Sequence, residues 1–210
     1  MIPAIASKLP DVGTTIFTVM SRKAEEHGAI NLSQGFPDFA LPAGLGEALA
    51  RHVAAGRNQY APMAGVLALR EQIALKIARC HGCNVDPDDA VTVVPGATEA
   101  IFCAIMATVG AGDEVILFDP SYDSYEPSVR LAGGRAVRIP LLPPDFAIDW
   151  QRVAGAVTPR TRMIVINSPH NPTGSVLAAA DLDSLEELVQ RHGLLVLSDE
   201  VYEHIVYDGR

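Results

Sequence analysis

The chain has 210 residues, 49% of them hydrophobic and 20% charged, which is typical of a globular protein with one domain, or one domain and part of another. The formal net charge is −9, and acidic and basic residues are interspersed, which argues against a nucleic-acid-binding protein, since such a protein needs a basic face. No apolar run is long enough for a membrane span, and the N-terminus does not resemble a signal peptide, so we expect a cytoplasmic protein.

The first part of the chain predicts three helices, over about residues 16–26, 45–54 and 66–81. The third has apolar residues at helical spacing with charged residues between them. It runs into Cys80-His81-Gly82-Cys83, whose spacing is also that of a redox pair or half a zinc site. Because no second ligand pair follows, we interpret this segment as a helix end with reduced thiols and predict no metal site.

From residue 91 onward, strand and helix patterns alternate. Strands are predicted at residues 91–94, 114–118, 136–140, 163–166 and 194–197, and helices at 97–109, 125–132, 149–157 and 181–191. This order predicts a doubly wound, mostly parallel α/β sheet. Residues 194–197 are apolar without alternation, which is typical of a strand covered on both faces.

Polar groups follow three of these strands, at the sheet edge where ligands bind in such folds. Residues 95–98 form a turn and a helix start, whose free N–H groups would bind a phosphate. Asn167 and Asn171 flank a proline-rich turn, and Asp199 ends the last strand. Asp199 either caps the following turn or needs a cationic or proton-donating partner. Together the three groups favour a phosphorylated aromatic cation as ligand.

In order and spacing, these motifs resemble the class I/II aminotransferases, fold-type-I enzymes that use pyridoxal 5′-phosphate. Among these the methionine, glutamine and kynurenine enzymes are the most similar. The matching motifs extend from Leu32-Ser33-Gln34-Gly35-Phe36-Pro37-Asp38-Phe39 to Ser198-Asp199-Glu200-Val201-Tyr202-Glu203-His204. The resemblance implies an N-terminal arm and substrate loop over residues 1–44, part of the small domain. Residues 45–210 would be an incomplete cofactor-binding large domain.

The resemblance also assigns roles to individual residues. Gly96, Ala97 and Thr98 would bind the cofactor phosphate, and Tyr122 would stack on its ring. Asn171 and Tyr202 would share the pyridine 3′-oxygen, while Asp199 would keep the pyridine nitrogen protonated. Tyr60 would reach the phosphate of the partner subunit in a homodimer. Gly35, Phe36 and Asn171 would contact the substrate, Asn167 would line the same pocket, and His170 would support these groups without acting as acid or base.

The resemblance implies a Schiff-base lysine downstream of Tyr202, but the three lysines are Lys8, Lys23 and Lys76. We therefore expect an N-terminal fragment that contains no catalytic residue and is inactive alone. The expected whole enzyme transfers an amino group from a methionine-like, uncharged amino acid to a 2-keto acid. Alternatives are another fold-type-I enzyme, such as a cysteine–sulfur lyase, or a non-catalytic truncated binding module.

The resemblance has one further consequence for the sheet. The strand that matches residues 91–94 lies beside strands that follow the lysine. We therefore expect residues 91–94 to be displaced or unpaired within residues 1–210, and the isolated chain to aggregate through open strand edges.

Overall fold

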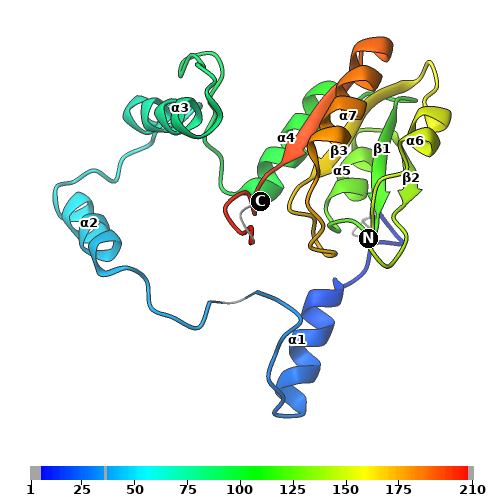
Figure 1. The fold of residues 1–210 in the computed structure, drawn as a ribbon. Helices are drawn as coiled ribbons and strands as arrows, with labels where there is room; N and C mark the ends of the chain where they lie inside the picture. Colours follow the sequence, from blue (N-terminus) through cyan, green and yellow to red (C-terminus); the bar gives the residue numbers. More distant parts are fainter. Residues whose placement is uncertain (1–5, 36, 208–210) are drawn as a thin grey trace, which may run out of the picture. The chain divides into compact units, whose positions relative to one another are not determined.

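The computed structural model describes residues 6–35 and 37–207. The chain forms two compact units, one of Met1–Gly13 with Pro95–Arg210 and one of Thr14–Val94. Figure 1 shows the fold coloured along the sequence. Within the described ranges, no helix is both long and apolar enough to cross a bilayer. The division of the chain at residue 44 remains a prediction.

The unit Thr14–Val94 contains the three predicted helices, α1 (Ile16–Glu26), α2 (Ala43–Ala54) and α3 (Leu67–His81). Helix α3 ends at Gly82, whose φ of 68° is in the left-handed region that favours glycine. The buried Arg70 of α3 donates hydrogen bonds to the Gly65 carbonyl (3.2 Å) and the Asp88 carboxylate (3.0 Å). This guanidinium therefore joins the segments that precede and follow α3. Cys80 and Cys83 are exposed free thiols.

The other unit is built on a four-stranded parallel sheet in the order β2-β1-β3-β4. The strands are β1 (Glu114–Asp119), β2 (Arg135–Pro140), β3 (Thr161–Asn167) and β4 (Leu195–Asp199). The helices between them are α4 (Ala97–Thr108), α5 (Tyr125–Leu131), α6 (Trp150–Ala156) and α7 (Ala179–His192). The predicted doubly wound α/β fold is thus confirmed.

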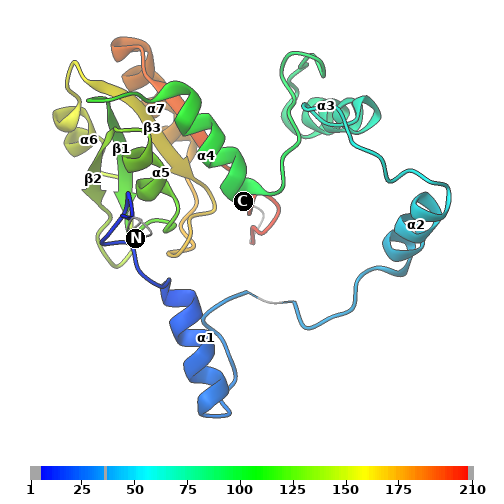
Figure 2. The same ribbon diagram turned by 180° about the vertical axis from the view of Figure 1, so that it is seen from behind.

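Helices cover both faces of this sheet (Figures 1 and 2). Successive strand residues point to opposite faces. Val115 and Leu117 of β1 therefore pack with α4 and α5, whereas Ile116 and Phe118 pack with α6 and α7. Burial on both sides explains why β1 and β3 read as continuous apolar runs.

Two predictions for the sheet were wrong in detail. Residues 91–94 form no strand, and the Val93 N–H group instead donates to the Ala64 carbonyl at 3.0 Å. This agrees with the expectation that the segment would be unpaired in this chain. Strand β4 is not covered on both faces, because the successive residues Leu195 and Val196, which point to opposite faces, are 37% and 41% exposed. It also lies at an edge of the sheet, paired with β3.

The two edge strands of the sheet differ in how they are protected. Strand β2 carries Arg135 and Arg138 and ends at Pro140, and charges and proline both discourage pairing with another chain. Strand β4 begins Leu195-Val196-Leu197 and has no charged residue before Asp199. Its edge therefore lacks the protection that charges and proline give to β2.

We expect residues 1–210 to aggregate through β4, and Val196→Lys to reduce this aggregation because a lysine on an edge strand disfavours pairing. Light scattering against concentration measures the effect. Val201→Lys is the control, since Val201 is also exposed but lies after the strand. Equal scattering from both variants would mean that added charge, and not the β4 edge, controls association.

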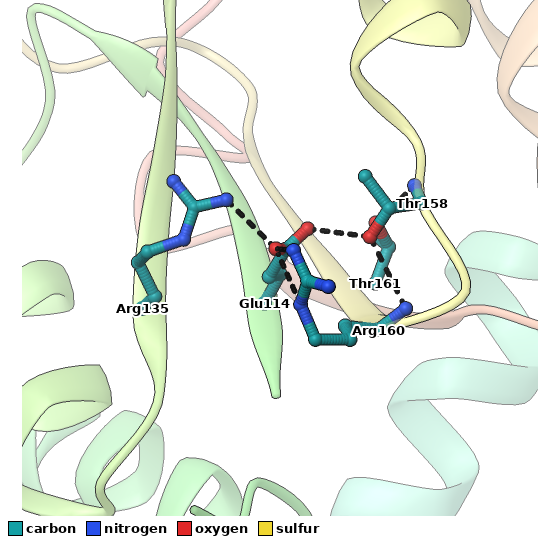
Figure 3. Close-up of polar contacts among 5 residues, drawn as sticks. All are labelled: Glu114, Arg135, Thr158, Arg160 and Thr161. Carbon is teal, nitrogen blue, oxygen red and sulfur yellow. Dashed lines mark hydrogen bonds and ion pairs between the residues drawn. The ribbon is translucent and has the colours of Figure 1, made fainter. Parts of the chain in front are cut away.

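At the amino ends of the strands, a buried carboxylate connects three segments of the chain through hydrogen bonds (Figure 3). The fully buried Glu114 begins β1. Its Oε1 accepts hydrogen bonds from Arg135 Nη2 (2.7 Å) and Arg160 Nη2 (2.7 Å), and its Oε2 accepts one from Thr158 Oγ1 (2.7 Å). The hydrogen bond from Arg135, followed by those from Thr158 and Arg160, lowers the pKa of Glu114 to about 2. Glu114 is therefore ionised at neutral pH and joins the starts of β1 and β2 to the turn before β3.

Candidate functional site

The carboxyl ends of β3 and β4 carry the centre of the candidate site. Asn167 and Asp199, the last residues of these strands, are paired in register and buried. Asn167 Nδ2 donates to the Asp199 backbone carbonyl at 2.7 Å, and Asn167 Oδ1 accepts the N–H of Asn171 at 2.7 Å. The predicted pocket residue Asn167 thus joins the loop after β3 to the end of β4.

The Asp199 carboxylate has a donor on each oxygen. Its Oδ2 accepts the hydroxyl of Tyr125 at 2.6 Å, and its Oδ1 accepts the Val201 N–H at 3.2 Å. Asp199 therefore both caps the following turn and has a proton-donating partner, the two possibilities left open by the sequence. Burial, together with the hydrogen bond to Asp199, raises the pKa of Tyr125, so the phenol stays protonated and remains a donor.

Two tyrosines connect Asp199 to the start of α4. The rings of Tyr122 and Tyr125 meet edge to face, with centroids 5.8 Å apart and planes at 73°. The Tyr122 hydroxyl lies 3.2 Å from Thr98 Oγ1 in the first turn of α4. Thr98, Tyr122 and Asp199, which are far apart in the sequence, therefore belong to one connected group.

The turn before α4 has the geometry of an anion site. Gly96 precedes the helix with φ 99° and ψ 163°, a backbone region essentially restricted to glycine. The first N–H groups of a helix have no acceptor within it, and the helix dipole adds partial positive charge there. Gly96, Ala97 and Thr98 thus offer backbone donors beside the Thr98 hydroxyl, a combination that fits a phosphate.

The loop after β3 contributes a buried histidine. His170 Nδ1 lies 2.8 Å from Thr173 Oγ1, and burial lowers the pKa of His170. Burial thus favours the neutral ring, and the supporting role of His170 stays a prediction. Tyr202 is half-buried and lines a cleft with His170 and Gly174.

Three predicted site residues are not placed in this group. Gly35 and Tyr60 belong to the unit Thr14–Val94, and the Tyr60 side chain is fully exposed. Phe36 lies outside the described residues. The roles of these residues remain predictions.

Tyr125 is the residue that the sequence interpretation missed. Tyr122 lies in the loop before α5 and Tyr125 is the first residue of that helix, so the two are near each other in the sequence. The pattern identifies two neighbouring tyrosines but cannot show that one of them meets a residue 74 positions later.

Comparison with known proteins agrees with this geometry. The family model for aminotransferase class I and II matches residues 27–210. Methionine aminotransferase from Escherichia coli is 56% identical over 199 residues, which are 95% of this chain and 52% of the relative. A probable N-succinyldiaminopimelate aminotransferase from Mycobacterium tuberculosis is 47% identical over 204 residues, 96% of this chain and 51% of the relative. The chain thus spans about half the length of these relatives.

Solved structures give the same result. An Escherichia coli structure with methionine aminotransferase function superposes with a TM-score of 0.93 at 56% identity, covering 96% of this chain and 53% of that one. N-succinyldiaminopimelate aminotransferase from Mycobacterium tuberculosis superposes with a TM-score of 0.94 at 46% identity, covering 99% and 54%. Proteins of this family use pyridoxal 5′-phosphate. The chain therefore belongs to the class I and II aminotransferases, and its parallel α/β sheet has the fold-type-I architecture.

Proposed function

We propose that residues 1–210 form the cofactor-holding part of an aminotransferase that moves an amino group from a methionine-like, uncharged amino acid to a 2-keto acid. The observation that carries this proposal is the environment of Asp199. Its buried carboxylate is at a carboxyl strand end, bonded to Tyr125 and connected through Tyr122 to the anion site at Thr98. A ligand that fits needs a phosphate, an aromatic ring and a positive nitrogen, and pyridoxal 5′-phosphate has all three.

Each group in the site has a definite task in this proposal. Gly96, Ala97 and Thr98 bind the phosphate, and Tyr122 packs on the ring. Asp199 stabilises the proton on the pyridine nitrogen, because opposite charges favour each other's ionised forms. When bound, the cofactor supplies a protonated aromatic ring that accepts electrons as the amino acid loses its α-proton.

The remaining polar residues orient the ring and the substrate. Asn171 and Tyr202 bond the pyridine 3′-oxygen, and the bond from the Asn171 N–H to Asn167 supports this placement. Gly35, Phe36 and Asn171 contact the substrate. An added side chain at position 35 would obstruct the approach of the backbone to the substrate carboxylate.

For the whole protein we propose a cytoplasmic homodimer in which Tyr60 binds the cofactor phosphate of the partner subunit. The complete exposure of Tyr60 in this chain is consistent with such a contact. We also propose that residues 1–44 are an arm and substrate loop beside an incomplete large domain, residues 45–210. No observation favours a cysteine–sulfur lyase or a non-catalytic module, and the relatives described above are aminotransferases.

The first test uses residues 1–210 with added pyridoxal 5′-phosphate. We expect reversible binding, seen as a change in cofactor absorbance, and no keto-acid formation from methionine. The reason is that all three lysines precede the anion site in the sequence, whereas the resemblance implies a Schiff-base lysine downstream of Tyr202. Borohydride reduction and digestion would show whether Lys8, Lys23 or Lys76 is labelled. Specific labelling of one of them together with turnover would refute the expected inactivity.

A second measurement tests the reaction itself. Residues 1–210 are fused to the part of the Escherichia coli methionine aminotransferase that lies beyond the matched region. We expect this fusion protein to use methionine with a kcat/KM at least about tenfold above that for aspartate, since Phe36 and Tyr122, the predicted lining residues, offer no counter-charge to a second carboxylate. Faster turnover of aspartate would contradict the substrate proposal. A folded fusion protein that binds the cofactor but transfers no amino group would contradict the proposed reaction.

A further inference from the structure

Tyr125 makes contacts in two directions. Its hydroxyl donates to Asp199 Oδ2 at 2.6 Å, and its ring meets Tyr122 edge to face. The residue is only 3% exposed and belongs to the core formed with α4 and α5. Its position is therefore set by packing against the sheet and not by solvent-facing contacts.

The two donors to the Asp199 carboxylate, the Tyr125 hydroxyl and the Val201 N–H, belong to different parts of the chain. Val201 lies two residues after Asp199, so its N–H moves with the same turn. Tyr125 lies on α5, 74 positions away in the sequence. Only the phenol therefore fixes the carboxylate relative to a separate element. A hydrogen bond from a neutral donor to a carboxylate also holds that carboxylate in place, as a contact with a cationic ring nitrogen requires.

The ring of Tyr125 also contacts Tyr122, the residue proposed to stack on the cofactor ring. The edge of one aromatic ring carries partial positive charge and the face of the other partial negative charge, which favours the observed arrangement with Tyr122. The Tyr122 hydroxyl is in turn 3.2 Å from Thr98 Oγ1. The Tyr125 side chain thus contacts both the Asp199 carboxylate and Tyr122, and Tyr122 in turn contacts Thr98.

We infer that Tyr125 is a positioning residue of the cofactor site, whose hydroxyl fixes the Asp199 carboxylate and whose ring fixes Tyr122. One buried side chain then sets the distance between Asp199, which contacts the pyridine nitrogen, and Tyr122, which stacks on the ring. This inference rests on the proposed function, because it assigns the cofactor to Asp199 and Tyr122.

The test compares four forms of the fusion protein described above, the unaltered protein, Tyr125→Phe, Asp199→Asn and Ser128→Ala. The probe is pyridoxal 5′-phosphate labelled with ¹⁵N in its ring, whose chemical shift reports protonation of that nitrogen. We expect Tyr125→Phe to bind about tenfold more weakly, the effect of losing one hydrogen bond to a charged group. Its ¹⁵N signal should move toward the unprotonated position, a change that a purely structural role would not produce.

Ser128→Ala is the matched control, since it removes a buried hydroxyl of the same helix, which donates to the Ser124 carbonyl. It should bind within about twofold of the unaltered protein, with the same ¹⁵N signal. Tyr125→Leu, which also removes the ring edge, should bind more weakly than Tyr125→Phe. If the leucine variant does not fold, the phenylalanine variant decides.

The outcomes separate this inference from the proposed function. If Tyr125→Phe matches the unaltered protein in affinity and ¹⁵N shift while Asp199→Asn does not, the inference is overturned and the proposed function stands. If Asp199→Asn also matches the unaltered protein, or if a folded fusion protein binds no cofactor, the proposed function falls and the inference falls with it.

Discussion

Replacing Asp199 with asparagine is expected to lower the turnover of the fusion protein about a thousandfold while leaving its fold intact. Two opposite charges 4 Å apart attract by about 4 kcal/mol at an effective dielectric constant of about 20, which corresponds to about three powers of ten. Asparagine has nearly the same shape but no charge, so it loses this stabilisation of a protonated ring nitrogen. Steady-state kinetics with methionine and a 2-keto acid measure the loss.

The fold should survive because the contacts that hold this strand end are only partly changed. Asn167 bonds the backbone carbonyl of residue 199, and an asparagine oxygen can still accept the Tyr125 hydroxyl. Circular dichroism and the melting temperature test this expectation. Asp183→Asn, which neutralises an exposed carboxylate on α7, is the control and should retain full turnover. Turnover of Asp199→Asn within threefold of the unaltered protein would remove Asp199 from its proposed role.

Replacing Glu114 with glutamine is expected to destabilise residues 1–210 by about 3 kcal/mol, because breaking a buried ion pair leaves its partners without their counter-charge. Arg135 and Arg160 are each 63% exposed and can turn to water, which places the loss at the low end for buried pairs. The melting temperature should fall by about 6–12 °C. Glu71→Gln on α3 is the control, since Glu71 is exposed. An unchanged melting temperature in Glu114→Gln would mean that the network does not stabilise the fold.

The same variant predicts a pH dependence. The folded-state pKa of Glu114, about 2, is below the ordinary value of 4.5, so the ionised carboxylate stabilises the folded state. This contribution is complete above about pH 5 and is lost as the pH falls from 4.5 toward 2. The difference in melting temperature between the unaltered chain and Glu114→Gln should therefore shrink as the pH is lowered from 7 to 3. A constant difference would contradict the assignment of the depressed pKa to this network.

Local patterns predicted most of the fold because they follow from residues that are near each other in sequence. The sequence pattern predicted every helix of the described ranges, and apolar segments predicted the strands β1 to β4. The failures concern neighbours in space. Residues 194–197 read as a fully covered strand because the sequence records their apolarity and not the strand order, which leaves β4 at an edge. Residues 91–94 show the same limit, since a strand needs a partner that local pattern cannot supply.

The candidate site divides in a similar way. Asp199 and Asn171 could be identified because they lie at or after the carboxyl ends of recognisable strands, β4 and β3. The turn at Gly96 was identified from the helix start that follows it, although the strand predicted before it does not form. The hydroxyl of Tyr125 could not be assigned to Asp199, since their contact depends on how α5 packs on the sheet. Gly35 and Tyr60 have family roles but lie in the other compact unit, so their part in the site remains to be tested.

The Glu114 network and the candidate site lie at opposite ends of the same strands. Strand β3 starts at Thr161, opposite Glu114, and ends at Asn167, and its seven residues span about 20 Å. That distance is about twice the screening length of charges at physiological salt, and substitutions so far apart usually act independently. The end with Glu114 can therefore adapt to a warmer or more acidic habitat without altering substrate choice at the other. A protein engineer can likewise seek thermal tolerance among Arg135, Thr158 and Arg160 and leave the chemistry untouched.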